Sequence, residues 1–211
     1  LACDVEGAEI YYTTDGSEPT ATSPLYEKIV PVKEALTLKG AIFAHGRQMG
    51  KTLILPVRWN LATAKPVLGT NPTEKLLTNG IRGSLKYSDF EWCSWADNDS
   101  VSFTIDLLKP EMLNTLTLGC ITNNGMAIHK PASVRVEVSD DNSKFREAVV
   151  QSFTSEEIFR EGNFIENLSL KLGGTQARYV RVTAKGPGVC PASHVRPGQT
   201  SRIFFDEVML E

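Results

Sequence analysis

A strict alternation of apolar and polar residues constrains the fold of this chain more than any other feature. In residues 101–107 (VSFTIDL) the odd positions are apolar and the even positions are polar, and residues 134–138 (VRVEV) repeat the pattern. A period of two residues is typical of a β-strand with one buried face. Further strands are predicted at residues 167–172, 177–183 and 202–210. Because only residues 73–78 and 155–161 look weakly helical, we predict an all-β fold.

The N-terminal part of the chain predicts a second, smaller group of strands. Residues 9–14 (EIYYTT) are β-branched and aromatic and run into Asp15-Gly16, which is a strong turn signal. The other predicted strands here span residues 28–32, 35–44 and 51–59. This spacing favours a small antiparallel β-sandwich.

Residues 63–72 (TAKPVLGTNP) separate the two groups of strands. The segment has two prolines and a glycine and no periodicity, which is typical of a connection between domains. We therefore expect a first domain over residues 1–62, a linker over residues 63–72 and a second domain over residues 73–211. Long irregular segments between the strands of the second domain predict a jelly-roll β-sandwich whose end loops are where binding residues usually lie.

Composition and charge exclude several classes of function. The chain of 211 residues has 22 basic and 25 acidic residues and a net charge of -3, which disfavours a nucleic-acid partner. No run approaches the roughly 20 apolar residues that cross a bilayer, so we expect no membrane insertion. The sequence has no GxSxG, HExxH or P-loop motif. Because it begins at Leu1, we expect a fragment of a longer polypeptide with any targeting signal upstream; the alternative is a processed mature form.

The four cysteines do not form a recognisable metal or redox motif. Cys3, Cys93, Cys120 and Cys190 lie far apart without a CxxC spacing, which disfavours a zinc ribbon or a thioredoxin-type site. Cys120 lies in an apolar run and is interpreted as a small buried hydrophobic residue. Cys93 and Cys190 fall in predicted loops, and whether they pair is left open.

The N-terminal motifs carry a specific resemblance. They are residues 10–20 (IYYTTDGSEPT), 23–26 (SPLY) and 36–40 (LTLKG). Together they resemble the small immunoglobulin-like domain at the C-terminal side of bacterial chitobiases and β-hexosaminidases, over most of residues 1–62. The resemblance implies an immunoglobulin-like sandwich for this part of the chain.

The second domain resembles the discoidin-like modules, which are coagulation-factor C-type domains and include carbohydrate-binding module family 32. The matching motifs occur in the same order over the whole domain. They are residues 79–84 (NGIRGS), 92–95 (WCSW), 103–107 (FTIDL), 134–141 (VRVEVSDD), 177–182 (ARYVRV) and 205–208 (FDEV). The resemblance implies a galactose-binding-like jelly roll.

The two domain types together resemble the C-terminal tail of a family 20 glycoside hydrolase. This implies a non-catalytic accessory region whose partners are a glycan, of galactose or N-acetylhexosamine type, and an upstream catalytic domain. The bacterial periplasm or outer cell surface is the compartment that this analogy implies. The alternative is a structural spacer that packs on the upstream barrel and stabilises it without binding glycan.

Asp206-Glu207 looks superficially like the neighbouring carboxylate pair that catalyses hydrolysis in that family. Adjacent side chains of a strand point to opposite faces, so we do not expect the two carboxylates to act on one bond. The surrounding sequence also lacks the alternation of strands and helices that a barrel requires. We therefore expect no catalytic residue in this chain.

The discoidin resemblance implies a structural calcium ion between an early loop and the last strand. Calcium binds six to eight oxygen atoms from carboxylates, carbonyls and hydroxyls. Asn79 departs from the family, in which aspartate is usual at this position, and the alternative is a simple turn beside a solvated Glu207. The residues that the resemblance assigns to calcium are Asn79, Arg82, Ser84, Asp206 and Glu207.

A glycan site is expected on the end loops of the second domain. Trp92 and Trp95 can stack on a sugar ring, and the polar side chains around them can bind hydroxyl groups. The predicted site residues are Trp92, Trp95, Asn124, His129, His194 and Arg196. His194, in a segment rich in glycine and proline, is the preferred polar contact. The alternative for the two tryptophans is that they close the end of the core.

Overall fold

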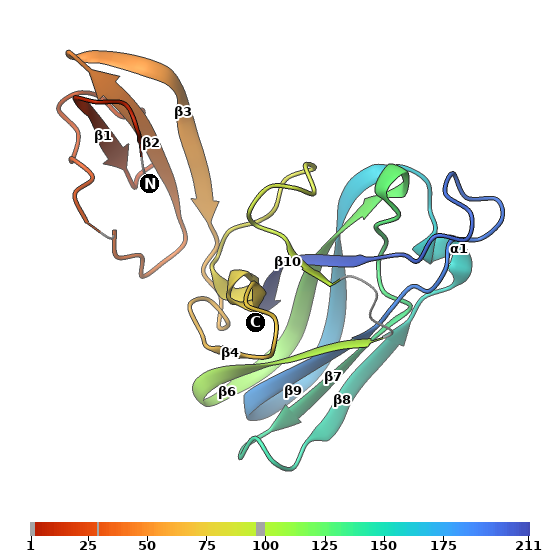
Figure 1. Cartoon of the computed structure of the whole chain (residues 1–211). Coiled ribbons are helices and arrows are strands. Elements are labelled where there is room, and N and C mark those ends of the chain that lie inside the picture. The colour runs from red at the N-terminus through yellow and green to blue at the C-terminus, as the bar shows by residue number, and fades with distance from the viewer. Residues whose placement is uncertain (1–2, 29, 96–99) are drawn as a thin grey trace. The chain divides into compact units, whose positions relative to one another are not determined.

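The computed structural model describes residues 3–28, 30–95 and 100–211. Its contacts divide the chain into two compact units, Leu1–Trp59 and Asn60–Glu211, and each unit is built from antiparallel strands (Figure 1). Among the described residues, the helical segments are single turns. The predicted all-β fold is confirmed.

The first unit is a three-stranded antiparallel sheet. Strand β2 (Leu36–Ala44) lies between β1 (Ala8–Thr13) and β3 (Arg47–Val57). The ring of Tyr11 packs edge-on against Phe43, with 5.4 Å between the ring centroids. The buried side of β2 therefore supplies the core of this unit.

One predicted strand of the first unit does not form. Within residues 28–32, residue 29 lies outside the described residues, and the described positions have no strand assignment. The chain between β1 and β2 instead makes an isolated bridge from Tyr11 to Leu25. Pro31 lies inside this segment and has no N–H to donate to a ladder, so the β-propensity of its neighbours is not realised.

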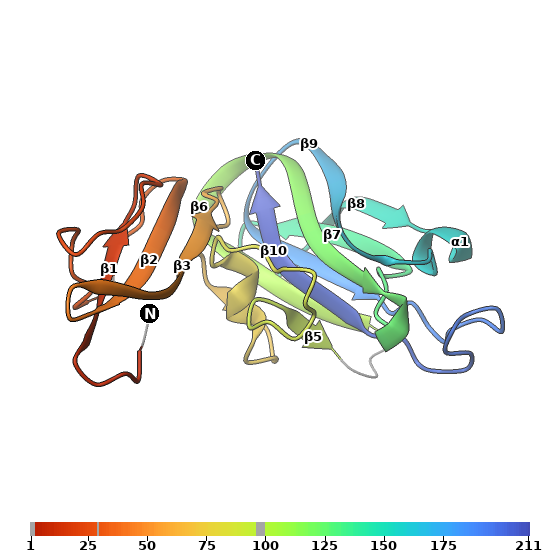
Figure 2. The same ribbon diagram turned by 90° about the horizontal axis from the view of Figure 1, so that it is seen from above.

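The second unit is organised by two long strands that pair along their whole length. Strand β6 (Ser100–Asn123) and β9 (Asn163–Lys185) are antiparallel, from Ser100 opposite Lys185 to Asn123 opposite Asn163. The register shifts between Asp106 and Glu111. Both strands curve there, as Figures 1 and 2 show, so one pair of strands contributes to both layers of a β-sandwich.

The remaining strands extend the two layers. One layer pairs the first half of β6 with β4 and the second half of β9 with β7, which pairs with β8. The other layer pairs the second half of β6 with β10, which pairs with β5. These elements are β4 (Val67–Leu68), β5 (Cys93–Trp95), β7 (Ser133–Ser139), β8 (Arg146–Ser152) and β10 (Ile203–Leu210), with single turns η1 (Glu74–Thr78), η2 (Asn124–Met126) and α1 (Ser155–Ile158).

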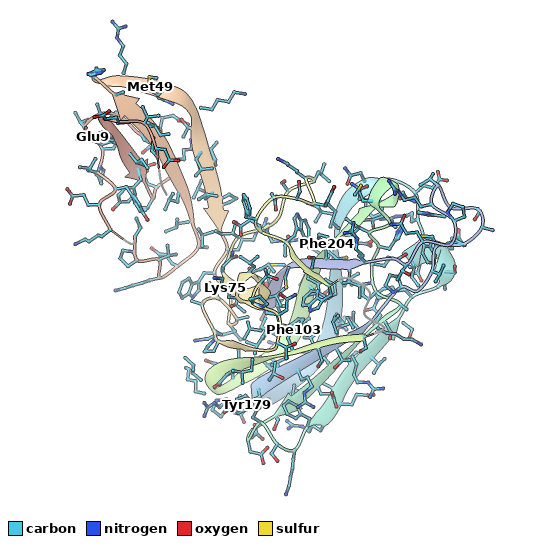
Figure 3. The ribbon with its side chains drawn as sticks, in the orientation of Figure 1. Glu9, Met49, Lys75, Phe103, Tyr179 and Phe204 are labelled. Carbon is cyan, nitrogen blue, oxygen red and sulfur yellow. The ribbon has the colours of Figure 1, made fainter. Side chains whose placement is uncertain are left out.

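The core of the second unit lies between these two layers. Val101, Phe103 and Ile105 of the first layer are at most 4% exposed. Leu116 and Leu118 of the second layer are fully buried, and Figure 3 labels Phe103 within this unit. The alternating segments therefore point their apolar faces into one core, as their period predicts.

Residues 63–72 pack into the second unit, although the sequence suggests a free linker. Val67 pairs with Ile105 of β6, the Asp106 N–H donates to the Pro66 carbonyl at 3.0 Å, and the neighbouring Ala62 is fully buried. A strand of two residues is too short to show a period, so proline and glycine dominate the sequence signal.

The described residues contain no helix with the length and apolar character needed to cross a bilayer.

Candidate functional site

Trp92 and Trp95 are core residues and present no indole face to a ligand. Trp92 is 5% exposed and Trp95 is 8% exposed. The Trp95 ring stacks on Phe103 with 6.1 Å between the ring centroids, and the Trp92 Nε1–H donates to the Ser84 carbonyl at 3.0 Å. This arrangement corrects the expectation that the two indoles stack on a sugar, because each ring already has apolar neighbours on the core side.

The predicted polar residues do gather at one end of the second unit, which we call the loop end. It is formed where residues 123–130, 154–162 and 186–202 meet, and both views place the α1 turn beside the long last loop (Figures 1 and 2). We call the residues that meet there the loop-end cluster. They are Asn124, His129, Phe159, Cys190 and His194, which meet through their side chains, and Arg196, which joins them through its backbone N–H.

His194 is held from two sides at the centre of the loop-end cluster. Its Nδ1 accepts the Arg196 backbone N–H at 3.0 Å. Its Nε2 lies 3.2 Å from the Asn124 side-chain nitrogen, whose amide oxygen accepts the Gly162 N–H at 2.7 Å. Three loops that are distant in sequence are therefore fixed to one another through polar side chains.

His129 is the least accessible member of the cluster. It is fully buried, and neither ring nitrogen has a hydrogen-bond partner among the described residues. Burial is the main cause that lowers the pKa of His129, to about 4, and the nearby His194 lowers it further. The Ile158 backbone acts in the opposite direction but is not at hydrogen-bond geometry. The ring is therefore neutral at neutral pH and cannot touch a sugar, which corrects its place among the predicted glycan contacts.

Phe159 is the aromatic side chain that sequence reasoning missed at this end. Its ring lies 5.1 Å from the His129 ring and 6.1 Å from the His194 ring, between centroids, and it is half-buried. The α1 turn before it begins with a capping box in which the side chains of Thr154 and Glu157 each bond the other residue's backbone N–H. The Thr-x-x-Glu spacing was the sequence signal that could have revealed this turn.

Exposure divides the loop-end cluster into a buried and an accessible part. Asn124 and His194 are each 8% exposed, whereas Arg196 is exposed. The Arg196 side chain donates to the Gln199 side-chain oxygen at 3.3 Å. The residues that an external ligand can reach are therefore Arg196, Gln199 and the exposed part of Phe159. His194 holds the backbone of Arg196 through the hydrogen bond to its N–H.

A second polar site joins the loop at residues 79–84 to strand β10. The register of β10 against β6 shifts between Phe205 and Val208, and this irregularity contains Asp206 and Glu207. Both side chains are fully buried and both reach the same loop. The sequence pattern predicted that the two side chains point to opposite faces of the strand. The register shift indicates a bulge, and the extra residue of a bulge interrupts the regular alternation of side chains.

Asp206 is the centre of what we call the carboxylate clamp. Its Oδ2 accepts the Arg82 Nε–H at 2.6 Å and the Gly83 N–H at 2.9 Å. Its Oδ1 accepts the Glu207 N–H at 2.7 Å. Gly119 on β6 makes room for this ion pair, because a Cβ at that position would lie 2.0 Å from Asp206 Oδ1.

Glu207 is the other carboxylate of the clamp and is only half satisfied. Its Oε2 accepts the Gly80 N–H at 3.1 Å, while Oε1 has no hydrogen-bond partner among the described residues. Burial raises the pKa of Glu207 to about 9, although the Gly80 N–H and the nearby Asn60 side chain act in the opposite direction; the Asn60 amide nitrogen does not reach hydrogen-bond geometry with Oε1. A buried carboxylate oxygen without a donor is the group that a hard cation would satisfy.

The other residues expected to bind calcium lie in the same loop. Asn79 Oδ1 accepts the Ile81 N–H at 2.8 Å, and Ser84 Oγ accepts the Lys86 N–H at 3.2 Å. Each of these oxygens keeps a second lone pair. These are oxygen donors of the kind that calcium binds, as is Glu207 Oε1, whereas the Asp206 carboxylate is already neutralised by Arg82.

The four cysteines are free thiols. Cys93 is buried in β5, and its thiol lies 3.2 Å from the Thr73 hydroxyl. Burial raises the pKa of the Cys93 thiol to about 12. Cys190 belongs to the loop end, where its Sγ lies 3.3 Å from the Ser201 hydroxyl. Cys93 and Cys190 therefore do not pair in this structure.

A shallow hollow also lies on the outer face of the sheet that contains β7 and β8. Its volume is about 360 Å³. It offers two basic side chains, Arg135 and Lys185, beside small hydroxyl residues. The residues that line it are Ser100, Ser133, Arg135, Val150, Thr183 and Lys185.

Comparison with known families gives two matches. Residues 62–195 match the F5/8 type C domain, and residues 1–53 match the chitobiase/beta-hexosaminidase C-terminal domain. The chain belongs to the F5/8 type C family, and it carries the chitobiase-type domain before that module, as the motifs predicted. No curated protein sequence matches the chain.

Several solved structures are similar to the chain. The module CpGH89CBM32-6 of Clostridium perfringens is 18% identical, covers 72% of this chain and 98% of its own, and gives a TM-score of 0.47. A fucose binding module of Streptococcus pneumoniae, SpX-3, is 17% identical, with coverages of 72% and 97% and a TM-score of 0.44. The C-terminal domain of a chitobiase from Bacteroides fragilis is 16% identical, with coverages of 65% and 78% and a TM-score of 0.39.

Proposed function

We propose that the second unit is a non-catalytic carbohydrate-binding module and that its loop end is the surface that contacts the sugar. The observation that carries this proposal is the convergence of Asn124, Phe159 and His194 from three loops far apart in sequence, with the Arg196 backbone N–H bonded to His194. Membership of the F5/8 type C family supports it. Binding residues on loops held by a rigid sandwich are the usual arrangement for such a module.

Each accessible residue has a chemical role in this proposal. The guanidinium of Arg196 donates to sugar hydroxyl groups, and Gln199, which already accepts from Arg196, fixes its direction. The open side of the Phe159 ring lies against the apolar face of a pyranose. One shallow contact of this size gives an affinity of about 10 µM to 1 mM, or roughly 4 to 7 kcal/mol. We propose galactose or an N-acetylhexosamine as the sugar.

Titration of the chain with galactose, N-acetylglucosamine and chitooligosaccharides tests the proposal. We expect Arg196→Ala to weaken the affinity about tenfold, since a hydrogen bond to a charged group contributes about 1.5 kcal/mol. Arg135→Ala is the matched control, because Arg135 is also an exposed arginine but lies in the hollow on the outer sheet face. Loss of binding in Arg135→Ala alone would move the site to that hollow. If the folded protein shows no detectable binding to any of these sugars, the proposal is wrong.

We also propose that the chain is the accessory part of a longer glycoside hydrolase, with β-N-acetylhexosaminidase activity in an upstream domain. The match of residues 1–53 to the chitobiase-type domain supports this parent, and it favours a secreted or periplasmic setting. Turnover of the longer polypeptide on soluble and polymeric substrates, with and without residues 63–211, tests the role. A loss confined to the polymeric substrate indicates glycan binding by the module.

A supporting role for the first unit is favoured by the apolar surface of its edge strand. Met49, Leu53 and Ile54 of β3 are 48%, 44% and 54% exposed, and β3 has a strand neighbour on one side only. Because Leu53 and Ile54 are consecutive and point to opposite faces, these side chains border the unpaired edge of β3 on both faces, and such an apolar edge is typical of a strand that another domain covers. We propose that the upstream domain of the same polypeptide covers it. Replacing Leu53 and Ile54 with threonine should lower the melting temperature of the longer polypeptide more than that of this chain.

We propose calcium as a structural ion of the carboxylate clamp, held by Glu207 with oxygen atoms of the loop at residues 79–84. The unpartnered Oε1 of Glu207 supports this assignment. Bound there, the ion neutralises a buried carboxylate. Calcium should raise the melting temperature relative to chelator, and Glu207→Gln should abolish the increase while Glu156→Gln, an exposed control, retains it. An unchanged melting temperature in the original chain would refute the site.

A further inference from the structure

We propose that His129, Cys190 and His194 form a binding site for one divalent transition-metal ion of the zinc type. One ligand atom from each of the three side chains lies within 4.8 Å of the other two. This proposal goes beyond glycan binding and does not depend on it. Two imidazoles and a thiolate are donors that zinc binds in preference to calcium or magnesium.

The strongest observation is the unsatisfied imidazole of His129. The residue is fully buried, yet both of its ring nitrogens lack a hydrogen-bond partner within the part of the chain that the structure describes. A buried polar group without a partner costs about 1 to 3 kcal/mol. A metal ion bound to one ring nitrogen of His129 would remove that cost for this nitrogen. The ring contacts with Phe159 and His194 account for the packing of the imidazole but give its nitrogens no partner.

The second ligand, His194, would exchange one of its present contacts for the metal. Its Nδ1 accepts the Arg196 backbone N–H at 3.0 Å, so the proton of the neutral ring is on Nε2, which lies 3.2 Å from the Asn124 side-chain nitrogen. A metal ion binds the unprotonated nitrogen of a neutral imidazole, while the other nitrogen donates its N–H and fixes the ring. His194 therefore binds an ion when the metal replaces one of these two contacts.

Cys190 brings sulfur to the cluster from the same loop. It is 3% exposed, and the sequence Cys190-Pro-Ala-Ser-His194 places two ligands four positions apart. A short spacing between two ligands of one loop, with a third from elsewhere in the fold, is typical of structural zinc sites. The Ser201 hydroxyl, 3.3 Å from Sγ, can donate to the thiolate that forms when the metal displaces the thiol proton.

The metal would have a structural task at this position. Residues 186–202 form a long loop with two isolated bridges, one from Val189 to Thr200 and one from Arg202, at its end, to Ile128. A metal ion would tie this loop, through Cys190 and His194, to His129 on the segment that follows β6. Because a cross-link between distant segments restricts the unfolded chain, it stabilises the folded one. The exposed Arg196 would then be carried by a fixed loop.

The test is metal binding by the full chain in the absence of sugar. After treatment with a chelator and removal of the chelator, we expect one equivalent of Zn²⁺ by calorimetry and by metal analysis after dialysis. His129→Phe, Cys190→Ser and His194→Gln should each weaken binding by about 100-fold or more, since even partners outside the coordination sphere are worth about 10- to 100-fold. His45→Gln and Cys3→Ser, which change the first unit, are the matched controls and should bind like the original chain.

Cobalt gives a readout that does not depend on how well a variant folds. Co²⁺ bound to the unaltered chain should show a thiolate-to-metal charge-transfer band, and Cys190→Ser should lose that band while retaining a weaker d–d spectrum. Zinc bound equally by the original chain and all three ligand variants would be adventitious and would overturn the proposal. Absence of the charge-transfer band in the original chain would also overturn it. Because neither readout involves sugar, a negative glycan titration leaves this result unchanged.

Discussion

The carboxylate clamp and the loop-end cluster of the second unit differ in the chemistry of their unsatisfied groups. In the clamp, Oε1 of Glu207 has no hydrogen-bond donor among the described residues. The carboxylate of Asp206, by contrast, accepts from Arg82 and from two backbone N–H groups. In the loop-end cluster, the two nitrogens of His129 lack partners beside another imidazole and a thiol. The comparison teaches that the proposed calcium site and the proposed zinc-type site use separate residues, one set with oxygen donors and the other with nitrogen and sulfur donors.

The largest expected effect is loss of the ion pair in the clamp. Asp206→Ala leaves the Arg82 guanidinium and the Gly83 N–H without their acceptor, so we expect the free energy of unfolding to fall by about 3 to 5 kcal/mol. Urea denaturation of the chain measures this. Asp140→Ala removes an exposed partner of Arg146, 3.9 Å apart, and should cost less than about 1 kcal/mol. Equal effects of the two variants would show that the clamp does not hold the fold.

Exchanging the two cations between the two sites sharpens the comparison. At about 100 times the dissociation constant, each bound ion should add about 2.7 kcal/mol to the free energy of unfolding. Glu207→Gln should remove the calcium increment and keep the zinc increment, and Cys190→Ser should do the reverse. Melting curves of the three proteins with each cation measure this. One variant that abolishes both increments would mean that the two sites are not independent.

Crowding the clamp should have a smaller effect. Gly119→Ala places a methyl group against Asp206 and Arg82, and overpacking of this kind costs about 1 to 3 kcal/mol. Gly125→Ala is the control, because its nearest neighbour would lie 3.5 Å from the new Cβ. Urea denaturation of both variants gives the difference. A Gly119→Ala protein as stable as the control would contradict the tight approach of β6 to the clamp.

The smallest expected effect is at the loop end. Thr154→Ala removes the cap of the turn that carries Phe159, and loss of such a cap costs about 1 kcal/mol. The variant should also weaken sugar binding, since the Phe159 ring loses its fixed position. Ser152→Ala, on the exposed end of β8, is the control. If Thr154→Ala has the same stability and sugar affinity as the control variant, Phe159 is not part of the proposed glycan surface.

The strands were predictable because their signal is local. The alternation in residues 101–107 and 134–138 reappears as buried faces of β6 and β7, and the ordered motifs correctly indicated both families. The two tryptophans could not be assigned from sequence, because an aromatic residue in a predicted loop reads the same whether it faces solvent or the core. Phe159 was missed for a related reason: residues 155–161 look weakly helical, but a single turn does not show which distant loops its side chains meet.

The sequence by itself determined that this chain is built from two β-rich units, because side-chain polarity along a strand reports which face is buried. Only the tertiary structure decided that Asp206 and Glu207 reach one loop and that His129, Cys190 and His194 share one cluster. The physical reason is that a bulge changes the facing of side chains without changing the composition. Contacts between distant loops likewise depend on how β6 and β9 curve across both layers, which no local pattern records.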